Sequence, residues 1–140
     1  INAAYLLAQL ESHGEVTANR MARWNQYDAG LADLKAAGRI ETPFIPAGCT
    51  HNAHMYYIKC RDIAERTELT AFLKERGIGA VFHYIPLHSA AAGLKYSRFH
   101  GEDRYTTRES ERLLRLPLYY GLTEADCAAV IDALHEFYRA

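Results

Sequence analysis

Residues 77–88 are the stretch that most constrains how this chain can fold. Gly77 follows a helical pattern and can adopt the left-handed backbone conformation that ends a helix at low steric cost. Residues 80–84 begin with a short apolar run that is typical of a strand, and Pro86 cannot donate to a sheet, so the strand must end before it. Three polar rings surround this strand end: His83, Tyr84 and His88. A strand that ends in titratable groups is a common place for a site.

The composition indicates one ordinary globular domain. The chain has 140 residues, of which 49% are hydrophobic, so it is long enough for a real core. Its formal net charge of −1 gives no field that would recruit nucleic acid or an anionic membrane, and no apolar run has the length of a membrane span. Three cysteines in no paired spacing argue against a disulfide framework and favour a reducing cytosol.

The first third of the chain predicts two helices. Apolar residues recur at intervals of three and four from Ala3 to Leu10, and a second, longer pattern ends at Gly38. We therefore divide the chain into a helical arm, 1–38, and a small α+β domain, 39–140. Because the sequence starts at Ile1 with a helical pattern that has no N-cap, we expect it to be a piece of a longer protein.

The remaining residues predict a short sheet with helices packed mainly on one face. A strand is expected within 53–60, followed by a helix that Thr67 caps and by the strand 80–84. A long loop then covers 89–105. The expected elements after it are a helix that Thr106 caps and that carries Arg108, Arg112 and Arg115, an edge strand at 116–118, and a closing helix from Thr123.

Clustered histidines raise two chemical possibilities, and the residues support neither strongly. A zinc site could use His51 and His54 with His83 or His88, and Cys49, but the spacing matches no metal motif and hydrogen-bonded histidines explain it better. We predict no metal. A cysteine–histidine pair could join Cys49 or Cys60 to His83, but Cys60 ends an apolar strand and is better explained as a small core residue.

A pocket for an anionic small molecule is a third possibility. Tyr84 offers a hydroxyl and a stacking face, while His83 and His88 offer donors to phosphate or carboxylate. Simple packing of Tyr84, with both histidines capping a loop, explains the residues equally well. A lysine suited to Schiff-base chemistry is not evident, because the four lysines fit solvated surface: Lys35, Lys59, Lys74 and Lys95.

Four stretches together resemble a known family. These stretches are 52–58, 72–78, the sequence His-Tyr-Ile-Pro-Leu-His at 83–88, and 111–118, which ends in Leu-Pro-Leu. They resemble the C-terminal domain of the sugar-nucleotide aminotransferases of the DegT/DnrJ/EryC1/StrS family, over nearly the whole chain. The resemblance implies the small domain of a fold-type I enzyme that uses pyridoxal 5'-phosphate and works as a cytoplasmic homodimer.

The resemblance also implies roles for particular residues. The full-length enzyme would move an amino group from glutamate to a dTDP-keto sugar, with its Schiff-base lysine in a large N-terminal domain. This chain would then hold no catalytic residue, bind no cofactor by itself and be inactive alone. By position, substrate binding falls to His83, Tyr84 and His88, with His54 as a weaker candidate. A second hypothesis is a stand-alone nucleotide-sugar-binding or interaction domain without catalysis.

Overall fold

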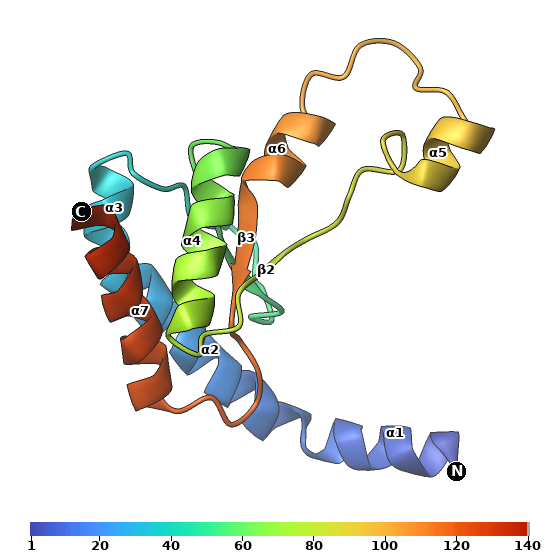
Figure 1. Cartoon of the computed structure of the whole chain (residues 1–140). Coiled ribbons are helices and arrows are strands. Elements are labelled where there is room, and N and C mark those ends of the chain that lie inside the picture. The colour runs from blue at the N-terminus through green and yellow to red at the C-terminus, as the bar shows by residue number, and fades with distance from the viewer. Residues whose placement is uncertain (140) are drawn as a thin grey trace.

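A computed structural model describes residues 1–139, and Figure 1 shows its elements in chain order. The helices of the first third are α1 (Asn2–Glu11), α2 (His13–Gly30) and α3 (Ala32–Ala36). A βαβ unit follows, made of β1 (Tyr56–Lys59), α4 (Ile63–Glu75) and β2 (Val81–Phe82). The chain then forms α5 (Ala91–Tyr96), α6 (Thr106–Arg112), β3 (Leu113–Leu116) and α7 (Glu124–Arg139).

The sheet is small and its central strand comes last in the sequence. Its order is β1-β3-β2, and β3 is antiparallel to both neighbours. Because β1 and β2 each run opposite to β3, they are parallel to each other, and α4 connects them. In the register, Tyr56 lies opposite Leu116 and Ile58 opposite Leu114. These four side chains share one face, since side chains alternate along a strand.

Helices cover that face and leave the other one open. The four side chains of the covered face are at most 4% exposed, and Figure 1 shows α4 and α7 together on one side of the sheet. Tyr27 of α2 lies against Tyr56 with ring centroids 5.1 Å apart, and its hydroxyl donates to the Pro117 carbonyl at 2.9 Å. The opposite side chains of the strands, which we call the open face, are Tyr57, Lys59, Val81, Leu113 and Arg115. The predicted α+β class with helices mainly on one face is confirmed.

Several expected elements are present with shifted ends. The strand expected within 53–60 is β1, but the strand expected at 80–84 is only the two residues of β2. The helix expected from Thr67 begins at Ile63, because the Asp62 side chain accepts a hydrogen bond from the Glu65 N–H at 2.9 Å and caps it. Thr123 caps α7 as predicted, accepting from the Asp126 N–H at 3.1 Å.

The region before α7 is where the sequence-based expectations were wrong. The helix expected to carry Arg108, Arg112 and Arg115 ends at Arg112, and Arg115 lies on β3. Residues 113–116 form the central strand, whereas an edge strand at 116–118 was expected. Thr106 is the first residue of α6 and not its N-cap. Pairing on both sides of β3 replaces the helical hydrogen bonds that these residues would otherwise make.

The segment expected to be a loop at 89–105 contains α5 and forms an arm. Figure 1 shows this arm, 83–105, extending away from the helices α4 and α7. Gly93 permits its fold, because a Cβ at that position would lie 1.6 Å from the Leu87 carbonyl oxygen. The other projecting element is α1, none of whose residues is buried. Its exposed apolar side chains are Tyr5, Leu6, Leu7 and Leu10.

Candidate functional site

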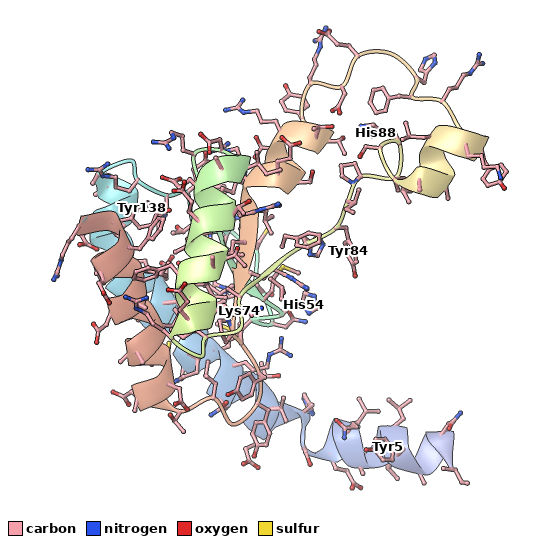
Figure 2. The ribbon with its side chains drawn as sticks, in the orientation of Figure 1. Tyr5, His54, Lys74, Tyr84, His88 and Tyr138 are labelled. Atoms are coloured by element: carbon pink, nitrogen blue, oxygen red, sulfur yellow. The ribbon has the colours of Figure 1, made fainter. Side chains whose placement is uncertain are left out.

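The open face and the chain that leaves β2 carry the residues that could bind a ligand. In Figure 2, His54 and Tyr84 lie on the far side of the sheet from Tyr138, which is among the helices. His54 precedes β1, and Tyr84 follows β2 by two residues. Both candidates therefore stand at the end of a sheet strand, where the backbone positions them firmly while the side chains stay accessible.

The loop before β1 is held tightly and fixes the position of His54. Ala53 is fully buried and has a positive φ of 48°, a conformation that costs a residue with a Cβ about 1 kcal/mol. Its N–H donates to Nδ1 of His51, 3.3 Å away, and the His51 ring lies 4.4 Å from that of Trp24. Arg20 donates to the His54 carbonyl, and the His54 side chain is exposed.

Tyr84 lines a hollow at the base of the arm. The hollow has a volume of about 300 Å³, and Arg66, Phe82 and Pro86 also line it. Tyr84 is 70% exposed and its ring meets that of His83 edge-on, with centroids 4.5 Å apart. The Nδ1 atom of His83 is buried without a hydrogen-bond partner among residues 1–139. An aromatic face beside a guanidinium suits a planar, charged ligand group.

His88 has a different environment from its two neighbours in the motif. Its Nε2 lies 3.0 Å from Oδ2 of Asp103 and 3.2 Å from Oγ1 of Thr107, and its ring meets Phe99 at 4.6 Å. The Thr107 hydroxyl donates to the same carboxylate oxygen at 2.5 Å, which lowers the pKa of Asp103, as does the nearby His88. We call these residues, His88, Asp103 and Thr107, the clasp, because they join the two ends of the arm.

We expect the clasp to keep the arm in place. Asp103→Asn removes the carboxylate, so trypsin should cut after Lys95 and Arg98 several-fold faster than in the parent chain. The matched control is Glu102→Gln, whose carboxylate is 74% exposed and, within residues 1–139, pairs with Arg104 alone, at 2.9 Å. Because folding lowers the pKa of Asp103, the clasp should be intact above the carboxyl's ordinary pKa and weaken as the pH falls below it. Equal cleavage of both variants would contradict this role.

Two charged groups that were not predicted to belong to the site lie near it. Arg115, expected on a helix, projects from β3 on the open face beside His54, and the two residues line one hollow of about 180 Å³. On the same face, Lys59 pairs with Glu109 at 2.6 Å and with Glu41 at 3.4 Å. Leu and Arg favour a helix, but the alternation of apolar and charged residues at Leu114, Arg115 and Leu116 also fits a strand, and this second signal could have placed Arg115 on a sheet face.

Among residues 1–139, the geometry supports neither a zinc site nor a cysteine–histidine nucleophile. Within residues 1–139, no three His, Cys, Asp or Glu side chains are grouped to hold a metal ion. Cys60 is fully buried and burial raises its pKa to about 11, so its thiol is not an activated nucleophile. It lies 3.9 Å from the hydroxyl of Tyr138, in the core, as the sequence predicted. No helix among residues 1–139 is long and apolar enough to cross a bilayer.

Comparison with known proteins identifies the family. The sequence pattern of the DegT/DnrJ/EryC1/StrS aminotransferase family matches residues 1–135, almost the entire chain. The chain belongs to this family. The match includes all four stretches that carry the resemblance and every candidate residue of the site.

Solved structures show the same fold. The family member described here is similar to DesV from S. venezuelae, solved in complex with a ketimine intermediate, at 26% identity and a TM-score of 0.87 over 99% of the chain. The aminotransferase TlmJ from Streptoalloteichus hindustanus matches 94% of the chain at 27% identity and a TM-score of 0.82. A DegT DnrJ EryC1 StrS aminotransferase from Brucella abortus matches 99% of the chain at 28% identity and a TM-score of 0.76.

This member of the family spans about a third of each of those proteins. It covers 36% of DesV, 34% of TlmJ and 35% of the Brucella abortus protein. The expected fold, the small α+β domain of such an aminotransferase, is confirmed by these matches. Roles for His54, His83, Tyr84 and His88 in substrate binding stay predictions.

Proposed function

We propose that this chain is the C-terminal domain of a pyridoxal-phosphate-dependent aminotransferase that acts on nucleotide sugars. The family match over residues 1–135 carries this proposal. The ketimine in the similar protein DesV supports it, since amino transfer to a keto compound proceeds through the cofactor. The whole enzyme takes its amino group from glutamate, acts as a homodimer and works in the cytoplasm. The predicted division into a helical N-terminal arm, 1–38, which is distinct from the arm 83–105, and a small α+β domain, 39–140, belongs to the same proposal.

The finer assignment concerns the sugar. The sequences of residues 83–88 and 99–107 are most like those of the transaminase that makes dTDP-4-amino-4,6-dideoxygalactose. We therefore propose dTDP-4-oxo-6-deoxyglucose as the acceptor of the amino group. This product is a precursor of enterobacterial common antigen, a cell-surface polysaccharide. The exposed ring of Tyr84 offers a stacking face to such a substrate, and Arg66, which lines the same hollow together with Glu111, offers a guanidinium.

The chain alone should not transaminate. Lys59 is held by two carboxylates, which raise its pKa, whereas a Schiff-base lysine needs a free amine. Lys95 lies 5.0 Å from the ring of Tyr96, and Lys35 and Lys74 are exposed on helices. Figure 2 shows Lys74 on α4. We therefore propose that the cofactor's lysine belongs to another part of the enzyme.

Two assays test the proposal. The chain, supplied with glutamate, pyridoxal phosphate and the keto sugar, should form no amino sugar, whereas the protein encoded by the natural reading frame that contains residues 1–140 should form it. A start codon directly before Ile1 would instead favour the stand-alone binding domain. Amino-sugar formation by the isolated chain would contradict the assignment of the lysine elsewhere.

A substitution tests the part that this domain plays. In the full enzyme, we expect Tyr84→Ala to raise KM for the nucleotide sugar about tenfold and to leave KM for glutamate within about twofold, because a lost stacking contact costs roughly 1–2 kcal/mol. Tyr5→Ala is the matched control, because Tyr5 is 72% exposed on α1, far from Tyr84 in Figure 2. An unchanged KM in Tyr84→Ala would remove Tyr84 from the site.

A further inference from the structure

Arg115 is a cation for which residues 1–139 supply no counter-ion. Its Nε atom is buried and has no hydrogen-bond partner among residues 1–139, and no carboxylate in that range forms an ion pair with its guanidinium. Leaving a buried donor of a charged group unpaired is unfavourable, so such a group needs an explanation. The side chain is half-buried between two strands, opposite Tyr57 on one side and Val81 on the other.

Lys59, on the same face, is a cation that does have carboxylate partners within the fold. It contacts Glu109 at 2.6 Å and Glu41 at 3.4 Å, and Arg112 at the same end of the sheet contacts Glu41 at 2.5 Å. The chain thus supplies carboxylates to the cations at one end of the open face. Beside Arg115, the part of the chain that the structure describes supplies none.

The space beside Arg115 suits a small oxyanion. The hollow has a volume of about 180 Å³, and its lining includes His54, Gly79 and Val81 but no Asp or Glu. A Cβ at Gly79 would meet nothing within 4 Å, so the approach on that side is open. The exposed imidazole of His54 is a second donor, and the strained, hydrogen-bonded loop at Ala53 fixes its place.

We propose that Arg115 is the anchor of an oxyanion-binding site on the open face, with His54 as its second donor. A guanidinium presents paired N–H groups that match a carboxylate or a phosphate, and a central strand holds it in place before the ligand arrives. The choice of ligand rests on the proposed function. The group bound is either the carboxylate of the amino donor or the diphosphate of the nucleotide sugar, and both present the same chemistry to Arg115.

Nuclear magnetic resonance of the 140-residue chain tests the site without any assay of amino transfer. The Arg115 Nε–H signal is followed while sodium pyrophosphate or sodium L-glutamate is added, against sodium chloride of equal ionic strength. We expect a saturable shift with at least one of the two anions and none with chloride. Saturation by pyrophosphate alone assigns the diphosphate, and saturation by glutamate alone assigns the carboxylate. A response to neither anion, or an equal one to chloride, overturns the proposal.

Variants separate a built site from general attraction of anions. Arg115→Gln should abolish saturation, read from the backbone amides of Val81 and Tyr57, while Arg39→Gln should retain it, since Arg39 is exposed. Arg115→Lys keeps the charge but loses the paired donors, so its dissociation constant should rise about tenfold, which keeps the test valid if the glutamine variant does not fold. Equal binding by all three variants overturns the proposal. The titration measures anion binding and not amino transfer. A negative result would therefore contradict the oxyanion site alone, and the activity assays would still decide the aminotransferase assignment.

Discussion

Leu114→Ala is expected to lower the free energy of unfolding by about 3 kcal/mol, which is a large part of the roughly 5–15 kcal/mol that stabilises a typical domain. Leu114 is fully buried on the central strand, with Ile58 opposite it on β1 and Phe82 opposite it on β2. Removing three carbon atoms there leaves a cavity between the sheet and the helices that cover it, and the paired backbone on both sides prevents the site from collapsing.

The measurement is urea unfolding followed by the fluorescence of Trp24, the single tryptophan, which is 7% exposed. Leu113→Ala is the matched control, since Leu113 is the adjacent residue on the same strand and belongs to the partly accessible open face. We expect this control to cost less than about 1 kcal/mol. Equal losses in the two variants would show that the two faces of the sheet are equally covered.

Glu109→Gln is expected to lower the free energy of unfolding by about 1–2 kcal/mol near pH 7, more than an isolated surface ion pair contributes. Glu109 contacts Lys59 at 2.6 Å and Arg112 at 3.4 Å, and Arg112 has a side chain only 11% exposed. The substitution leaves both cations with Glu41 as their remaining carboxylate. Because Arg112 also donates to the Cys60 carbonyl at 2.7 Å, its position should persist while its charge is less well compensated.

The pH dependence of this loss follows from the pKa of Glu109. The hydrogen bond from Lys59 lowers that pKa in the folded chain, and the charges of Lys59 and Arg112 lower it further. The unfolded chain therefore binds the proton first as the pH falls, so the stabilisation is complete above the ordinary pKa of 4.5 and is lost below it. The difference between the parent and Glu109→Gln should be large at about pH 7 and small at about pH 3.5.

Glu111→Gln is the control for that experiment. Glu111 lies on the same helix, α6, and its side chain forms no hydrogen bond or ion pair within residues 1–139, so its substitution should change stability by less than about 0.5 kcal/mol at either pH. A Glu109→Gln penalty that is the same at both pH values would show that packing, and not charge, sets the contribution of this residue.

Residue types alone identified the candidate residues of the site but not the surroundings of each one. His83, Tyr84 and His88 were identified because they surround a strand end, but the structure gives them separate surroundings. Tyr84 lines a hollow, whereas His88 is engaged by Asp103 and Thr107 in the clasp. Asp103 is 15 residues further along the chain, and no sequence periodicity links it to His88. Contacts of this kind depend on the path of the arm.

The secondary structure was predictable where local signals and tertiary contacts agree. The caps at Thr123 and the Gly77 helix end depend on neighbouring residues, so they could be read directly. Residues 113–116 carry leucines and an arginine, which favour a helix locally, yet they form the central strand. Hydrogen bonds to β1 and β2, together with burial of Leu114 and Leu116, outweigh that local preference.

By itself, the sequence determined the α+β class, the helices with clear apolar stripes and the family resemblance, because each depends on local pattern and residue identity. Only the tertiary structure decided that β3 lies between β1 and β2 and that one face of the sheet stays open. It also decided that Lys59 lies beside Glu109, whereas the Nε atom of Arg115 has no hydrogen-bond partner among residues 1–139. These outcomes depend on which distant residues approach a strand, and the free energy of that pairing is not encoded in any single stretch.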